Sequence, residues 1–151
     1  MRRDAVATRD RLLGAAEQLF ANRGVYRTTL REITQAAGQR NTSAVSYHFG
    51  SRTGLLEELL LRHAGPLDEQ RGLILAGLDP GPDTRALVGV LLRPLLGCLD
   101  DPSGRNYLRI VAQLSDQFAQ WRDEAPYTGP NLRTVLDDLE RRPVECAPAA
   151  R

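Results

Sequence analysis

Long apolar runs are missing from this chain of 151 residues, and their absence excludes whole classes of protein. No stretch is apolar over enough residues to span a membrane, and the N-terminal MRRDAVATRDR lacks the apolar segment of a secretion signal. The two cysteines, Cys98 and Cys146, are too few and too far apart for a disulfide scaffold or a zinc site. We therefore expect a cytoplasmic protein with no membrane contact and no bound metal.

Lysine is absent as well, and aromatic residues make up only 5% of the chain. The core must therefore consist mainly of Leu, Ala and Val. All twenty basic residues are arginine, and the charge balance is +4 over residues 1–64 and −3 over residues 65–151, which gives the net +1. A basic N-terminal part on a mildly acidic remainder suits a protein that offers one end to a polyanion.

Helix signals occur along the whole chain, whereas no segment shows the apolar and polar alternation that is typical of a β-strand. Thr8 can cap a first helix that runs to about Asn22. Thr29 and Glu32 fit the capping-box pattern at the start of a second helix, which lasts two turns before Gly38. The sequence therefore predicts an all-α fold.

Strong breakers mark the ends of the later helices. A third short helix follows Asn41 or Thr42, and Ser51 caps a fourth helix whose leucine stripe ends at Gly65-Pro66. Beyond this point the pattern predicts longer amphipathic helices, the second of them capped by Thr84 and kinked or shortened by Pro94, at about residues 66–78, 84–99, 105–124 and 131–141.

The segment TTLREITQAAGQRNTSAVSYHFGSRTGLL, residues 28–56, carries the clearest functional signal. Two short helices joined through Ala37-Gly38, the second rich in small polar residues and aromatics, are typical of a chain that presents one helix to the DNA major groove. The basic balance of the same region agrees with this interpretation.

From Thr8 to about His63 the chain resembles the TetR family of bacterial transcriptional regulators. The resemblance depends on four features in order: RDRLLGAAEQLFANRG, TTLREITQAAG, the YHFGSR junction and the leucine-rich helix that follows. It implies a three-helix DNA-binding head followed by a helical body that binds a small ligand and dimerises. The expected division is a head over residues 1–48, a connector helix over 49–64, a shortened regulatory body over 65–141 and a disordered tail over 142–151.

The resemblance also implies that the third helix enters the major groove of double-stranded DNA. Its groove-facing candidates are Thr42, Ser43, Ala44, Ser46, Tyr47 and His48. The turn and the third helix together, GQRNTSAVSYHF, are one residue longer than the common family pattern, so which of Arg40, Asn41 and Thr42 points at bases is open.

Other positions of the head match the family's phosphate contacts and its core. Thr28, Arg52, and either Tyr47 or His48 match positions that typically hold phosphates, and helix N-termini favour anions on physical grounds alone. Val45 and Phe49 look like the core-facing pair of the third helix. For His48 a buried, hydrogen-bonded place in the core is the alternative.

The body offers weaker signals. Tyr107, Val111, Phe118 and Trp121 are candidates for a ligand pocket, and simple core packing is the alternative. His63 is expected at the end of the fourth helix, as a partner of the helix dipole or else as a ligand contact. The leucine pairs at 91–92 and 95–96 are expected in the core, with dimer packing as the alternative.

We therefore expect a ligand-responsive repressor that binds a palindromic operator as a homodimer and responds to a small apolar or amphipathic effector. No cofactor and no catalytic residues are expected, because the chain has no metalloprotease His-Glu-x-x-His run, no phosphate-binding glycine loop and no nucleophile elbow. The chain is shorter than the family pattern, which normally continues into two long C-terminal helices that form the dimer. The alternative is therefore a truncated or partner-dependent interaction module that modulates a full-length relative.

Overall fold

The computed structural model describes residues 2–115 and 127–142, and within these ranges all regular structure is helical. This confirms the predicted all-α fold for the described part of the chain. The described helices are α1 (Arg2–Arg23), α2 (Leu30–Ala36), α3 (Ser43–Phe49), α4 (Arg52–Ala76), α5 (Thr84–Gly97), α6 (Pro102–Leu114) and α8 (Pro130–Glu140).

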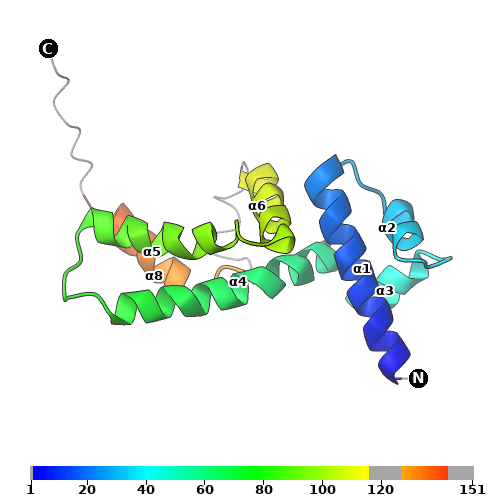
Figure 1. Ribbon diagram of the computed structural model, residues 1–151, viewed down its shortest axis with the longest axis horizontal. Helices are drawn as coiled ribbons and strands as arrows, with labels where there is room; N and C mark the ends of the chain where they lie inside the picture. Colours follow the sequence, from blue (N-terminus) through cyan, green and yellow to red (C-terminus); the bar gives the residue numbers. More distant parts are fainter. Residues whose placement is uncertain (1, 116–126, 143–151) are drawn as a thin grey trace, which may run out of the picture.

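The helices form a head and an elongated body that are joined by α4 (Figure 1). Helices α1, α2 and α3 lie together at one end, and α4 leads from them into the body, where α5 and α8 pack along its second half. Helix α6 packs against α1, so the body contacts the head through two helices rather than one.

Two apolar clusters stabilise this arrangement. The larger one joins the head to the first part of α4 and to α6, and its fully buried members include Phe20, Ile33, Val45, Leu55 and Ile110. The smaller cluster joins α5 to α8 through Leu87, Val90 and Val135. Because the larger cluster includes both head and body residues, the two parts share one core.

The capping signals of the head are confirmed. The Thr29 hydroxyl accepts a hydrogen bond from the Glu32 amide, and the Glu32 carboxylate accepts one from the Thr29 amide at 2.8 Å. Helix α4 begins after Ser51, whose hydroxyl accepts a bond from the Gly54 amide at 2.9 Å. These contacts satisfy amides that have no partner inside a helix, which is why the two helices begin at these residues.

The predicted start of the first helix is wrong. Helix α1 begins at Arg2, and Thr8 lies inside it, where its hydroxyl accepts a bond from the Arg11 guanidinium at 3.1 Å. The residues before Thr8 include two alanines and an acid in the first turn at Asp4, which favour helix formation without a cap at Thr8.

The predicted end of the connector helix is also wrong. Helix α4 continues through Pro66 to Ala76, so the expected connector over residues 49–64 and the expected helix over residues 66–78 are one helix. A proline inside a helix costs about 3 kcal/mol. Buried residues on both sides of it, among them Leu60 and Leu67, offset this cost because they pack against the larger cluster.

The later helices differ from the prediction mainly at their ends. The side chain of Asp83 caps α5, not that of Thr84, and α5 passes Pro94 and ends at Gly97. Asp101 caps α6, which therefore begins at Pro102 rather than at residue 105. The expected continuation of this helix over 116–124, like the expected disordered tail from residue 143 onward, falls outside the described residues.

Helix α6 buries one side and leaves the ligand-pocket candidate Val111 on the other. Tyr107, Ile110 and Leu114 are buried, whereas Val111 and Ser115 are exposed. The reason is the packing of α6 against α1, which selects one of two overlapping apolar faces.

A buried polar cluster fixes α1 to the body. The Glu17 carboxylate on α1 is only 7% exposed and lies 3.3 Å from Nε2 of His63 on α4. It also accepts hydrogen bonds from the Ser103 hydroxyl at 2.9 Å and from the Asn106 amide at 3.4 Å, both on α6. The His63 ring stacks on Tyr107 with 4.7 Å between ring centroids.

This cluster corrects the expectation for His63, which lies within α4 and not at its end. Its contacts also explain the acidity of Glu17. Burial by itself raises the pKa of Glu17, but the hydrogen bonds from His63, Ser103 and Asn106 outweigh burial and leave the pKa below its usual value.

We predict that Glu17→Gln destabilises the fold by about 1–2 kcal/mol at neutral pH, because the variant loses charge-assisted hydrogen bonds. A lowered pKa in the folded state means that the contribution of Glu17 is present at neutral pH and is lost as the pH falls through the acid range. Urea unfolding at several pH values measures this, and the difference between the wild type and the variant should shrink toward acid pH.

The exposed Glu69 of α4 offers the matched control, since Glu69→Gln removes a carboxylate on the same helix. It should change the free energy of unfolding by less than about 0.5 kcal/mol. An equal effect of both substitutions would show that the contacts of Glu17 contribute nothing specific.

Candidate DNA interface

The turn between α2 and α3 is fixed by local hydrogen bonds. Gly38 adopts φ +69°, a left-handed conformation that favours glycine. The Gln39 amide then donates to the Thr34 carbonyl at 2.8 Å, and the Asn41 side chain accepts a bond from the Ser43 amide at 2.9 Å. Helix α3 therefore begins at Ser43 with Asn41, rather than Thr42, as the side chain that caps it.

Helix α3 presents one polar face and one apolar face. Val45 is completely buried, and Phe49 packs against the same cluster, so the predicted core-facing pair is confirmed. On the other side Ser43 and Ser46 are exposed, and Tyr47 has 82% of its surface exposed. An exposed tyrosine of this kind has a hydroxyl and a ring available for a partner.

A shallow hollow runs along this polar face. It is formed by the predicted residues together with neighbours from α1 and the turn, namely Thr8, Gly38, Gln39, Arg40, Asn41, Ser43, Ala44, Tyr47 and His48. Thr42 is exposed beside it. The structure thus brings together the predicted candidates of residues 40–48 on one open surface.

His48 is half-buried at the edge of this hollow. Its ring meets Tyr47 edge-on, with 5.0 Å between ring centroids, and lies 6.1 Å from the ring of Phe49. The ring therefore bridges the exposed and the buried side of α3, and the core alternative for His48 is not what the structure shows.

Thr28 does not belong to this surface. It is only 3% exposed, and its hydroxyl donates to the Gly24 carbonyl at 2.9 Å and lies 3.3 Å from the Leu19 carbonyl. These hydrogen bonds stabilise the turn after α1. Because Thr28 is buried, its side chain is not placed for the predicted phosphate contact.

Arg52 has a similar structural role. Its guanidinium donates to the Thr28 carbonyl at 3.2 Å and to the Val25 carbonyl, and it lies over the ring of Phe20 at 5.3 Å. These interactions occupy the side chain because the first turn of α4 faces the turn after α1. The Arg52 guanidinium thus has partners in the turn after α1 and on α1 itself.

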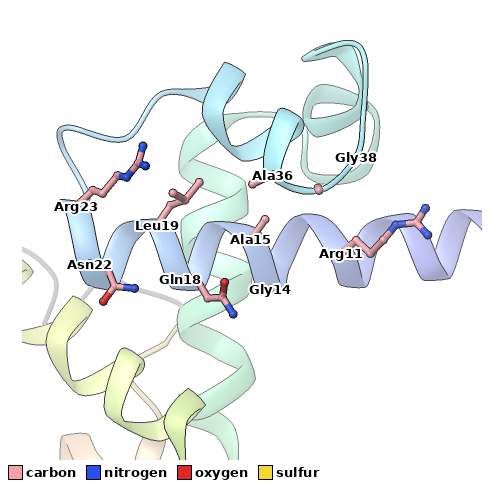
Figure 2. Close-up of a pocket in the computed structure, with 10 residues that line it drawn as sticks. Arg11, Gly14, Ala15, Gln18, Leu19, Asn22, Arg23, Ala36 and Gly38 are labelled. Atoms are coloured by element: carbon pink, nitrogen blue, oxygen red, sulfur yellow. The ribbon is translucent and has the colours of Figure 1, made fainter.

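A second hollow lies between α1 and α2 and shares Gly38 with the first. Figure 2 shows Arg11 and Arg23 toward its two ends, with Ala15 and Leu19 between them. Arg23 is paired with Glu32 at 3.0 Å, whereas Arg11 is exposed near the N-terminal half of α1.

Thr8 and Gln39 are surface residues that the sequence analysis did not select. Thr8 was missed because it was interpreted as a helix cap, although the helix-favouring residues before it were a signal of an earlier start. Gln39 carried no signal of its own, since its place depends on the path of the turn.

The predicted ligand pocket is not assembled as expected. Tyr107 is buried, and burial raises its pKa to about 12, whereas Val111 lies on the exposed side of α6. Phe118 and Trp121 fall outside the described residues. A cleft of about 240 Å³ does occur between α4, α5 and the start of α6, with His63, Leu67, Pro94 and Cys98 among its lining residues.

Within the described residues no group of three His, Cys, Asp or Glu side chains lies together as a metal site would require. None of the described helices is both long and apolar enough to cross a membrane.

Comparison with known proteins agrees with this geometry. Residues 12–59, from α1 to the first part of α4, match the model of the family described as bacterial regulatory proteins, tetR family. The transcriptional repressor KstR2 of Rhodococcus jostii is 38% identical over 84 residues, which cover 53% of this chain and 39% of that protein. The transcriptional regulator TtgW of Pseudomonas putida is 29% identical over 131 residues, covering 78% of this chain and 93% of that protein.

The chain matches only 39% and 27% of the length of two of the curated relatives, KstR2 and the regulator TtgR of Pseudomonas putida. A solved structure of a putative TetR-family regulator from Rhodococcus sp. aligns with a TM-score of 0.52 at 22% identity, covering 88% of this chain and 65% of that one, which shows a shared fold. Residues 12–59 are therefore similar to the tetR family of bacterial regulatory proteins, and the chain shares the fold of a solved regulator of that kind.

Proposed function

We propose that the head binds double-stranded DNA with α3 in the major groove. The observation that carries this proposal is the exposed polar face of α3, which continues into Arg40 and the turn before it. An α-helix fits the major groove, where hydroxyl and amide groups can read base edges and arginine can hold phosphate or guanine. The proposed contacts are Arg40, Asn41, Thr42, Ser43, Ala44, Ser46, Tyr47 and His48; Thr28 and Arg52 instead support the turn behind them.

We propose that the protein is a repressor and not an enzyme. It would act in the cytoplasm as a homodimer on a palindromic operator. Support comes from relatives such as KstR2, which is named a transcriptional repressor. Two-fold operators need two heads at a fixed separation, since each head reads one half-site. A partner-dependent module that modulates a full-length relative is the second candidate, and it predicts protection of one half-site only.

The proposed control is conformational. The Glu17 cluster joins α1 to α4 and α6, so a small apolar or amphipathic effector that moves either helix would also move the head. A change in the separation of two heads would lose the match to two half-sites. Residues of the body would bind the effector, and the regulated genes would depend on the operator.

DNA footprinting of the purified chain at near-physiological salt tests the proposal. We expect a protected site with two-fold symmetry on DNA selected from the source genome, because each copy reads one half-site. Protection of one half-site alone would favour the partner-dependent module, and no protection at any site would overturn the proposed function.

The Arg40 side chain provides a test of phosphate contact. Arg40→Gln should weaken binding to all DNA sequences equally and reduce the salt slope of the binding constant by about 1, because one phosphate is no longer neutralised. Fluorescence anisotropy at several salt concentrations measures both quantities. Arg93→Gln on α5, another exposed arginine, is the matched control and should leave them unchanged.

A substitution at Ser43 should change the base preference of binding and leave its salt dependence unchanged. Ser43→Ala removes an exposed hydroxyl at the first turn of α3 and should change the preference for one base pair by about 1–3 kcal/mol without changing the salt slope. Selection of bound sequences from a randomised pool measures this preference. An unchanged preference would place Ser43 away from the base edges and shift the reading face along α3.

A further inference from the structure

The side chain of Arg71 is buried in the body without a hydrogen-bond partner. It lies on α4 and is only 5% exposed. No hydrogen bond or ion pair of its guanidinium occurs in the described part of the chain, and its Nε is inaccessible to solvent. A guanidinium has five N–H donors and stays charged inside proteins, so a buried arginine normally has acidic or carbonyl partners. A buried arginine without them indicates a place where a ligand can supply the acceptors.

Asp68 is a buried acid one turn before Arg71, but its oxygens bond elsewhere. Oδ1 accepts a hydrogen bond from the Leu132 amide at 2.7 Å, and Oδ2 accepts one from the Asn131 amide and one from the Asn131 side chain, each at 3.1 Å. Asp68 therefore holds the start of α8. Burial lowers the pKa of Arg71, and Asp68 is among the groups that raise it, yet these two described side chains form no ion pair. Asp68 thus helps to keep Arg71 charged and leaves its N–H donors unsatisfied.

Tyr107 is a second buried donor near Arg71. It lies on α6, is 8% exposed, and its hydroxyl has no hydrogen-bond partner among the described residues. Burial raises the pKa of Tyr107 to about 12, although Arg71 lowers it, so the hydroxyl keeps its proton at neutral pH and can donate it. A guanidinium and a phenol that lie within reach of each other's charge can donate to the same acceptor. A carboxylate is the acceptor that fits such a pair best, because hydrogen bonds to a charged oxygen are the strong ones.

A cleft lies next to these two donors. It is the cleft of about 240 Å³ between α4, α5 and the start of α6, and its apolar lining includes Pro66, Leu67, Pro94 and Cys98. Leu67 lies one helical turn before Arg71, and a helical side chain leans toward the N-terminus of its helix, so the Arg71 side chain is directed toward the turn of Leu67. Arg71 and the Cys98 thiol also interact electrostatically. Two lining residues of the cleft are therefore neighbours of the buried guanidinium.

We propose that Arg71 and Tyr107 bind the carboxylate of a small organic acid whose apolar part occupies this cleft. The charge of Arg71 selects an anion, and its planar donors match the two oxygens of a carboxylate. Arg62 and Asp101, which also line the cleft, have opposite charges, so Arg71 supplies the preference for an anion. The volume of the cleft equals that of roughly eight water molecules, which limits the ligand to about as many non-hydrogen atoms in its apolar part. A short alkyl or a single aromatic ring meets this limit.

The site deepens the proposed function, and its role in control rests on that function. The Tyr107 ring stacks on His63 with 4.7 Å between ring centroids, and Nε2 of His63 lies 3.3 Å from the Glu17 carboxylate of α1. A ligand that fixes the Tyr107 hydroxyl therefore acts on the head through one intermediate side chain. The effector is in this way narrowed to an amphipathic acid, which would shift the head between two orientations only if it binds one of them better.

Isothermal titration calorimetry of the full chain with benzoate and hexanoate tests the site without DNA. Both acids should bind, and the neutral benzamide and hexanamide should bind at least tenfold more weakly, because they carry the same apolar group without the charge. Arg71→Met should weaken the binding of both acids at least tenfold, and Tyr107→Phe should weaken it about three- to tenfold. Arg93→Met, at an exposed arginine of α5, is the matched control and should leave the affinity unchanged.

Urea unfolding separates loss of the site from loss of the fold. Arg71→Met replaces an unpaired buried charge by an apolar chain, so without ligand it should be at least as stable as the wild type. A less stable variant would show that the fold itself satisfies the guanidinium, and it would overturn the proposal. A wild type that binds neither acid, amides that bind as well as the acids, or an unchanged affinity in Arg71→Met would each do so too. Sulfate or chloride that binds as tightly as the acids would indicate a site for an inorganic anion only and would overturn the proposed ligand class.

DNA binding distinguishes this site from the proposed function. Benzoate should lower the affinity of the wild type for DNA and leave that of Arg71→Met unchanged, and a wild-type affinity that benzoate does not change would overturn the role in control. A chain that binds benzoate through Arg71 and binds no DNA would overturn the proposed function and support the site. A chain that binds DNA and neither acid would do the reverse.

Discussion

The buried carboxylate of Glu17 is bonded from both helices that connect the head to the body. His63 reaches it from α4, and Ser103 reaches it from α6. A carboxylate away from water is unfavourable unless its oxygens have partners, so these bonds favour one orientation of α1 over others that would bury as much apolar surface. Because α2 and α3 pack on α1 and α4, the same contact also sets the direction in which α3 faces.

The turn after α1 shows the same dependence on the body. Gln113 of α6 accepts a bond from the Val25 amide at 2.8 Å and donates to the Phe20 carbonyl at 3.1 Å. Arg52 of α4 donates to the Thr28 carbonyl from the other side. Thr28 and Arg52, which the family resemblance suggests as phosphate contacts, therefore stabilise the turn after α1 instead. The exposed polar surface is therefore smaller than the predicted DNA-binding set, and it lies on α3 and the turn before it.

The apolar residues of α5 explain how the body combines stability with an open surface. Val90 packs between α5 and α8 on one side of α5, and Leu92 and Leu96 are exposed on the other side. The helical period places leucines on both sides, but it does not show which side the fold covers. Only the position of α4 and α8 decides this. In the same way, the packing of α6 against α1 decides that Val111, a candidate for the ligand pocket, lies on the exposed side of α6.

By itself the sequence determined the local features of the head. The capping box of Thr29 and Glu32 and the turn at Gly38 each depend on residues within a few positions of one another, so they can be read without the fold. The outward face of α3 followed from the family resemblance instead. The tertiary structure decided that α4 continues through Pro66 and that Glu17 meets His63, 46 residues away in the chain. Both depend on contacts between segments that are far apart in the chain. The burial of apolar side chains in these contacts outweighs local preferences, such as that of Pro66 for ending a helix.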